Sequence, residues 1–226
     1  MENRFKPEKR SKKESLLPYG PVVTISRMYG CPAKRIAAML TSAINQIVEN
    51  NKSQEKWTLL GKEILEQSAK ELHLKPDLIK EIANTHGQGL IDDILLSFTN
   101  KYYPGDIKVK HTIGDIINEY AIRGKVVMVG RGGVALLRDV KKSVHIKITA
   151  PLEWRINDVS KRYMITLDEA ERRIKEIDLK RDHLRKFFAG KKIDDSVFDI
   201  IFNYYTCTEE EIISCTIKLM EKRDMI

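Results

Sequence analysis

The stretch Pro21-Val-Val-Thr-Ile-Ser-Arg-Met-Tyr-Gly30-Cys-Pro-Ala-Lys-Arg-Ile-Ala-Ala-Met-Leu40 decides the fold of this 226-residue chain. Its apolar, β-branched beginning predicts a buried strand over Val22–Ser26. A short turn follows, and the apolar spacing after it predicts an amphipathic helix over Ala33–Glu49. Backbone N–H groups in a tight turn that leads into a helix N-terminus form an anion site. The sequence therefore predicts a strand–turn–helix unit suited to phosphate, and the alternative is a plain connection between a strand and a helix.

The residues of this turn provide only part of what a phosphate-binding loop uses. Gly30 permits a positive φ, and Lys34 and Arg35 are the nearest cations. Pro32 carries no N–H group, so the turn offers one donor fewer than an ordinary P-loop. The Gly-x-x-x-x-Gly-Lys-Ser/Thr signature is absent. The turn thus has the setting of a phosphate-binding loop without its standard chemistry.

Length and composition indicate one α/β domain. With 42% hydrophobic and 32% charged residues the chain has a globular composition, and its length suffices for one core. No stretch reaches the length of an apolar membrane span, and the N-terminus is polar and basic, unlike a secretory signal. The three cysteines form no C-x-x-C pair, which fits a reducing compartment without structural zinc. We therefore expect a cytoplasmic protein without a membrane partner.

The formal net charge of +8 comes from two segments. Residues 1–20 hold six Lys/Arg against three acids, and residues 155–192 hold twelve against seven. The first segment mixes charge with Pro and Ser, which predicts a flexible basic tail ahead of a single domain over 21–226. The second segment is helical and dense in arginine. Nucleic acid is one partner that such charge suits, but no helix-turn-helix, zinc-finger or RRM signature accompanies it, so we expect small anionic substrates instead.

Strands alternate with helices along the rest of the chain. Further strands are expected at Trp57–Leu60, Val126–Val129, Val144–Thr149 and Phe198–Phe202. Helices are expected at 62–72, 76–83, 90–98, 112–123, 152–163 and 208–222, and after a capping box formed by Thr166 and Glu169. This alternation predicts an α/β fold, a three-layer α/β/α sandwich around a parallel sheet. Ligands of such sheets bind beyond the carboxyl ends of the strands.

Arginines occur where those strand ends are expected. Arg131 stands between glycines after the strand Val126–Val129, and a guanidinium there can clamp a phosphate with two parallel hydrogen bonds. The alternative is a surface arginine in a glycine turn. The arginines of the helical pair 152–186 include Arg155, Arg162, Arg181 and Arg185. As a group they are typical of the arginine-rich lid of phosphoryl-transfer enzymes, although the charged residues of helix faces are usually just solvated.

Metal ligands are harder to find in the sequence. No acid clearly follows a strand, and the histidines show no ligand spacing. We expect no metal site built by the protein, so any Mg²⁺ would be held by nucleotide phosphates and water. Asp92 and Asp93 fit an exposed helix edge, and His86 fits a glycine-flanked connector.

Taken together, these segments resemble the cytidylate kinase-like family, a branch of the nucleoside monophosphate kinases within the P-loop fold. Family members typically read Ser-Arg-Glu-Tyr-Gly-Ser-Gly-Gly-Arg-Glu-Ile-Ala at the first turn, and this chain reads Ser26-Arg-Met-Tyr-Gly-Cys-Pro-Ala-Lys-Arg-Ile-Ala37 in register. Similar motifs stand at Lys62–Glu66, Val129–Arg131, Ala150–Ile156 and Asp178–Arg181, and from Phe198 to Glu210. The resemblance spans residues 21–222, which is a whole domain.

The resemblance implies a P-loop nucleoside monophosphate kinase-like fold, with an acceptor-side helical region over 57–123 and a helical lid over 152–192. It implies ATP and Mg²⁺ as cofactors and small-molecule nucleotides as partners. The implied function is transfer of a phosphoryl group from ATP to a nucleoside monophosphate-like acceptor. The alternative is a non-catalytic kinase-fold protein that binds a nucleotide or a partner without turnover.

Roles carry over to the positions that match the family. The turn from Gly30 to Arg35 would cradle the phosphates of ATP, with Lys34 as the cation and Arg27 as a further phosphate contact, and Arg131 would grip the phosphate of the acceptor. The lid residues that would meet the transferred phosphoryl group are Arg155, Arg162 and Arg181.

The chain also departs from the family pattern at the same turn. Pro32 and Ala33 replace two family glycines, and Cys31 replaces the serine. Gly61 stands where the acceptor-side aspartate is expected. These departures fall on the catalytic parts of the fold, and they are why the non-catalytic alternative stays open.

Overall fold

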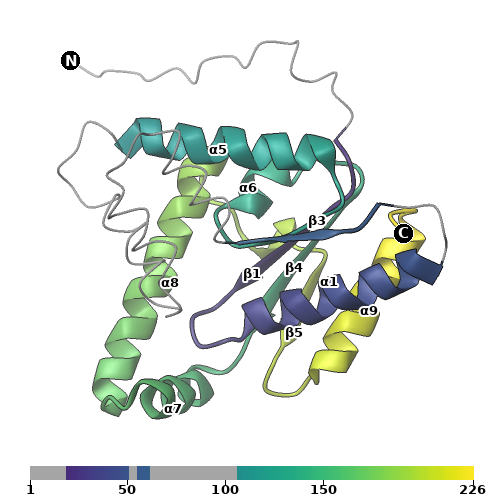
Figure 1. Cartoon of the computed structure of the whole chain (residues 1–226). Coiled ribbons are helices and arrows are strands. Elements are labelled where there is room, and N and C mark those ends of the chain that lie inside the picture. The colour runs from purple at the N-terminus through teal and green to yellow at the C-terminus, as the bar shows by residue number, and fades with distance from the viewer. Residues whose placement is uncertain (1–18, 51–54, 62–105) are drawn as a thin grey trace, which may run out of the picture.

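The structure, a computed structural model, describes residues 19–50, 55–61 and 106–226 (Figure 1). Most of the predicted basic tail and the helices predicted between 62 and 98 lie outside these residues. The described residues form an α/β fold in which helices cover both faces of a parallel sheet. The three-layer sandwich that the sequence predicts is confirmed.

The described part of the chain builds a five-stranded sheet in the order β2-β3-β1-β4-β5. Its strands are β1 (Val22–Arg27), β2 (Thr58–Leu60), β3 (Val126–Val129), β4 (Ser143–Thr149) and β5 (Ile200–Asn203). All pairs are parallel, and Val22 of the central strand lies opposite both Val126 and Ser143. The carboxyl ends of β1, β3 and β4 therefore share one edge, which brings together the residues that follow them.

The helices divide between the two faces of the sheet (Figure 1). One face packs against α1 (Ala33–Asn50) and α9 (Glu209–Lys222), and the other against α5 (Asp106–Arg123), α6 (Gly133–Leu137) and α8 (Leu167–Ala189). Between β4 and α8, helix α7 (Leu152–Tyr163) forms a helical hairpin with α8. Among the described residues, no helix combines the length and the apolar character needed to cross a bilayer.

The side chains of β1 alternate between two cores. Val23 and Ile25 are fully buried against α1 and α9, whereas Val22 is fully buried on the face of α5 and α6. Each such side chain stabilises the fold by about 1.5–3 kcal/mol relative to an exposed one. A strand buried on both faces needs a continuous apolar run, which is the pattern that predicts β1.

The predicted helix ends are confirmed where the sequence carries a capping signal. The Thr166 hydroxyl accepts from the Glu169 N–H at 3.2 Å, and the Glu169 carboxylate accepts from the Thr166 N–H at 2.9 Å. Helix α5 ends before Gly124, which has φ +75°. Gly124 also lies against Gly20, since a Cβ atom added to it would be 2.5 Å from the Gly20 Cα.

Other boundaries differ from the sequence prediction. The helix predicted over 112–123 begins earlier, at Asp106. The last strand begins at Ile200, because the residues before it form the short 3-10 helix η2 (Asp195–Val197) and its end. Helix α6 is not predicted at all. It has a single turn and starts after Gly132 in a left-handed conformation, so it is too short to show a period in the sequence.

Candidate phosphate-binding site

The turn after β1 folds back on itself. Gly30 adopts φ +97°, a conformation that favours glycine. The Cys31 N–H donates to the Met28 carbonyl at 3.2 Å, and the Ala33 N–H donates to the Cys31 carbonyl at 3.0 Å. Pro32 has no N–H group. In this conformation Cys31, Pro32 and Ala33 therefore present no backbone donor to a ligand.

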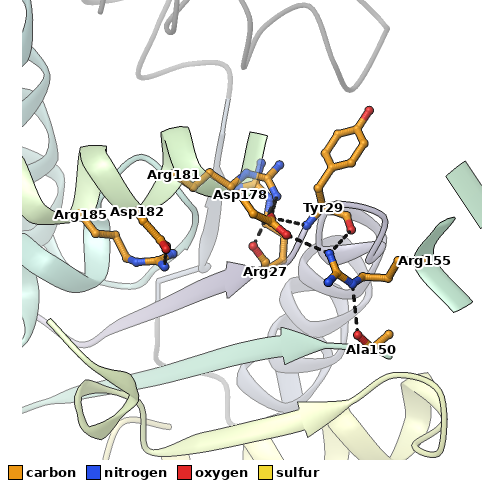
Figure 2. Close-up of polar contacts among 8 residues, drawn as sticks. All are labelled: Arg27, Tyr29, Ala150, Arg155, Asp178, Arg181, Asp182 and Arg185. Carbon is orange, nitrogen blue, oxygen red and sulfur yellow. Dashed lines mark hydrogen bonds and ion pairs between the residues drawn. The ribbon is translucent and has the colours of Figure 1, made fainter. Parts of the chain in front are cut away.

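A carboxylate from α8 occupies a further donor of the turn (Figure 2). The Tyr29 N–H donates to Asp178 Oδ1 at 2.7 Å, and Asp178 Oδ2 accepts from Arg155 Nη1 at 2.8 Å. Arg181 Nη1 lies 3.7 Å from Asp178 Oδ1. A carboxylate held by a backbone N–H and two guanidinium groups takes the place that an anionic ligand takes at such a turn. The sequence includes Asp178 in a family motif but assigns it no role.

Arg155 is the most buried of the predicted lid arginines, with its side chain only 5% exposed. Besides Asp178, it donates from Nε to the Ala150 carbonyl at 3.1 Å and from Nη1 to the Tyr29 carbonyl at 3.3 Å (Figure 2). It thereby ties the end of β4, the turn after β1 and helix α8 together. A buried guanidinium needs such partners, because an unpaired charge in the interior is costly.

The other two predicted lid arginines reach the same turn. Arg162 Nη2 donates to the Gly30 carbonyl at 3.3 Å, and Arg181 Nη1 donates to the Arg27 carbonyl at 3.3 Å. With Arg155 on the Tyr29 carbonyl, three arginines from α7 and α8 thus contact three carbonyls of one turn. The structure brings together the three residues that the sequence singles out, and their catalytic role stays a prediction.

The hairpin of α7 and α8 lies so close to the turn that little space is left. The cavity between them has a volume of about 20 Å³, the room of one water molecule. Its lining includes Gly30, Ala33, Lys34, Arg162 and Arg181. Lys34, the predicted phosphate cation, is therefore at the cavity. A nucleotide phosphate would need the hairpin to move before it could enter.

Arg131 and Arg27 lie in adjacent turns at the same sheet edge. The turn after β3 is fixed to β1 by the Gly130 N–H, which donates to the Ile25 carbonyl at 3.0 Å. The guanidinium of Arg27 lies against Gly130, since a Cβ atom there would be 2.0 Å from Arg27 Nη1. Arg131 itself is buried and left-handed, with φ +57°. The two turns that the sequence marks as phosphate contacts are neighbours.

Arg35 contacts Glu209 and Tyr204 in the structure, and its phosphate contact stays a prediction. Its Nε donates to Glu209 Oε1 and its Nη2 to the Tyr204 hydroxyl, both at 2.7 Å. It lines a groove of about 540 Å³ together with Pro32 of the turn. Trp154 and Tyr204, whose rings meet edge to face at 5.7 Å, form the aromatic part of this groove. Neither aromatic residue is predicted from the sequence as part of the site, although Trp154 lies within the motif Ala150–Ile156.

Burial keeps the other side chains of the turn neutral. It raises the pKa of the Cys31 thiol to about 11 and also raises the pKa of Tyr29. At neutral pH Cys31 is therefore a thiol, which is a poor nucleophile. Covalent chemistry at this turn is not favoured, and the chemistry of the site is that of its cations.

The described residues contain no group of three or more His, Cys, Asp or Glu side chains that is placed to hold a metal ion. The carboxylate nearest to the turn, Asp178, is paired with arginine. A carboxylate paired in this way is not placed to hold Mg²⁺. That nucleotide phosphates would hold the metal stays a prediction.

A parallel sheet in the order 2-3-1-4-5, a turn from β1 into α1 and a helical hairpin over that turn define the class of P-loop kinase folds. Two solved structures share the fold. An uncharacterized protein from Eubacterium ventriosum has a TM-score of 0.62 at 18% identity, covering 89% of this chain and 98% of its own. A shikimate kinase from Acinetobacter baumannii in complex with shikimate has a TM-score of 0.51 at 9% identity, covering 94% of this chain and 99% of its own.

The sequence places the chain more narrowly within that class. It belongs to the cytidylate kinase-like family, whose model matches residues 22–205. The matched range contains the turn after β1, Arg131 and the hairpin of α7 and α8. Comparison with curated proteins finds no match.

Proposed function

We propose that this nucleotide kinase-like protein transfers a phosphoryl group from ATP to a nucleoside monophosphate-like acceptor. The observation that carries the proposal is the convergence of Arg155, Arg162 and Arg181 on the turn after β1. Phosphoryl transfer depends mainly on positioning and on cations around the migrating group. Three guanidinium groups from two helices, gathered at one turn, suit that task.

In this proposal a bound phosphate exchanges partners with the protein. The three arginines leave the carbonyls of the turn and turn toward phosphate oxygens, and the Tyr29 N–H leaves Asp178 for the phosphate. The terminal phosphoryl group of ATP then breaks its bond to the bridging oxygen and bonds an oxygen of the acceptor. Arg131, on the neighbouring turn, is the proposed contact of the acceptor phosphate.

The aromatic groove beside the turn supports a nucleotide as one of the ligands. Its volume of about 540 Å³ lies in the range of small-molecule pockets. Trp154 and Tyr204 offer ring faces and edges for a base, and Pro32 connects the groove to the turn. We propose that the base of ATP lies in this groove while its phosphates reach the turn.

The test is a coupled assay of ADP formation with ATP, Mg²⁺ and a panel of nucleoside monophosphates. We expect turnover with at least one acceptor, and a fall in kcat of about 100-fold or more for Arg162→Gln, because one lost donor to transition-state charge typically costs that much. Lys175→Gln is the matched control, since Lys175 lies on α8 and pairs with Glu171 at 2.6 Å with its side chain 66% exposed. The proposal fails if no acceptor is turned over, or if both variants behave alike.

One observation favours the second function, nucleotide binding without turnover. Cys31, Pro32 and Ala33 present no backbone donor in the turn, and the cavity there holds about one water molecule. This alternative predicts that ATP or ADP raises the melting temperature although no acceptor is phosphorylated. Melting curves with and without Mg²⁺, recorded beside the turnover assay, separate the two functions.

A further inference from the structure

The side chain of Tyr29 leaves the turn after β1 and enters the hairpin of α7 and α8. Its ring extends away from the strands (Figure 2), and the residue is only 4% exposed. Tyr29 belongs to a small apolar cluster that is separate from the two cores of the sheet. The buried members of this cluster, which we call the hairpin core, are Tyr29, Val159, Ala170, Ile174 and Ile177. Of these described residues, Tyr29 alone lies outside the hairpin.

Cations from α8 contact the ring of Tyr29. The Cζ atom of Arg181 lies 5.5 Å from the centre of the Tyr29 ring, and that of Arg173 lies 5.8 Å from it. Arg173 also lies over the ring of Tyr163, at 4.5 Å. A guanidinium over an aromatic face is attracted by the ring, while the N–H groups in its plane still point to oxygen atoms. The Tyr29 ring therefore helps to orient Arg181, one of the three arginines that contact the turn.

The backbone of Tyr29 contacts the same hairpin. Its N–H donates to Asp178 on α8, and its carbonyl accepts from Arg155 on α7. The next residue, Gly30, lies so close to α7 that an added Cβ atom would be 3.3 Å from the Arg155 Cβ. One residue of the turn thus makes polar contacts with both helices through its backbone and apolar contacts through its ring. The hairpin cannot leave the turn without withdrawing an aromatic ring from its own core.

We infer that Tyr29 is a positioning residue, whose ring anchors the hairpin on the turn and thereby holds the three lid arginines at the phosphate site. This inference rests on the proposed function, since it names a residue on which the geometry of that reaction depends. Opening of the hairpin exposes the ring, and closing buries it again. Burial of the ring favours the closed state by tenfold or more, because tenfold corresponds to about 1.4 kcal/mol and burial of an aromatic side chain contributes at least as much.

The test uses Cys31 as a reporter of hairpin opening. Cys31 is buried and lines the cavity between the turn and the hairpin, so a thiol reagent reaches it when the hairpin opens. The other two cysteines, Cys207 and Cys215, are replaced by serine, and the labelling rate of the full chain is measured at constant pH. We expect Tyr29→Leu to speed the labelling of Cys31 about tenfold or more. Tyr29→Phe keeps the ring and is expected to leave the rate unchanged.

A second variant changes the hairpin core from the other side. Ile174, on α8, is 1% exposed, and Ile174→Ala should also speed the labelling although it leaves the turn intact. Ile44→Ala is the control for lost stability, because Ile44 is fully buried between α1 and the sheet. Each rate is compared with the free energy of unfolding in urea. The inference is overturned if Tyr29→Leu and Ile174→Ala leave the rate unchanged, or if labelling follows global stability alone.

Turnover separates positioning of the arginines from simple packing. We expect Tyr29→Leu to lower kcat, by up to about tenfold, without raising KM for ATP, because an open hairpin admits ATP but returns the arginines to it less often. Tyr29→Phe should restore the native kcat. A native kcat in a Tyr29→Leu variant whose Cys31 is labelled faster overturns the positioning role. If the native chain turns over no acceptor, the proposed function fails, and the labelling rates still decide whether Tyr29 anchors the hairpin.

Discussion

Replacing Asp178 with asparagine tests the contact that holds the hairpin on the turn. Asp178→Asn keeps the shape of the side chain and an oxygen that can still accept from the Tyr29 N–H. It removes the negative charge that faces Arg155 at 2.8 Å. The perturbation is thus confined to the ion pairs of one carboxylate, which are the close pair with Arg155 and the longer one with Arg181 at 3.7 Å.

The size of the effect follows from the burial of the two partners. The Arg155 side chain is 5% exposed and that of Asp178 is 21% exposed. Removing one partner of a fully buried pair costs about 3–5 kcal/mol. Because Asp178 is partly solvated and Arg155 keeps its two carbonyl acceptors, we expect a loss of about 2–3 kcal/mol in the free energy of unfolding.

Urea unfolding followed by circular dichroism measures this loss, and Asp182→Asn is the matched control. Asp182 stands on the next turn of α8 and pairs with Arg185, but its side chain is 62% exposed. The control variant should therefore lower the free energy of unfolding by less than about 1 kcal/mol. The second readout is the rise in melting temperature with added ATP. It should be larger for Asp178→Asn than for the native chain, because the phosphate no longer competes with a carboxylate. Equal unfolding free energies for the two variants, or equal responses of Asp178→Asn and the native chain to ATP, would refute the reasoning.

Two further predictions concern stability away from the site. Gly124→Ala should lower the free energy of unfolding by about 2–4 kcal/mol, because the new Cβ would lie 2.5 Å from the Gly20 Cα at φ +75°. The control is Gly190→Ala, at φ +70° with no described atom within 4 Å of the new Cβ, which should lower it by only about 1 kcal/mol. Equal losses for the two variants in urea unfolding would contradict this prediction. Burial lowers the pKa of His145, so below its unfolded pKa of about 6.5 the unfolded state binds the proton more readily than the folded state. The free energy of unfolding should therefore fall between pH 7.5 and 5, and a His145→Gln variant with the same pH slope contradicts the assignment.

The sequence predicts the elements whose signal is local. The strand β1 has a β-branched run that must be buried on both faces, and α8 has a complete capping box at Thr166 and Glu169. Helix α6 has no such signal, because one turn that opens at a left-handed Gly132 shows no apolar period. Local patterns therefore suffice for the parallel sheet and its order of layers, but not for every short helix.

The candidate site shows the same difference between what local sequence indicates and what depends on contacts between distant elements. The sequence marks Arg155, Arg162 and Arg181 as a group, and they do meet at one turn. It does not indicate that Arg155 is buried against Asp178, because that contact depends on how α8 lies on the turn. Arg35 shows the same limit: nothing in its local sequence indicates that Glu209, from the other end of the chain, would take its guanidinium.

Asp178 connects the two functions proposed for this chain. If the closed hairpin is favoured by about 2 kcal/mol, closed molecules outnumber open ones about 30-fold, and the apparent affinity for a phosphate ligand falls by the same factor. The backbone of the turn regains only part of that affinity, through the Tyr29 N–H, because Cys31, Pro32 and Ala33 present no donor. The ligand must gain the rest from Arg155 and Arg181, which Asp178 neutralises in the closed state. Whether this chain transfers phosphoryl groups or only binds them therefore depends on the competition between a phosphate and one carboxylate for those two arginines.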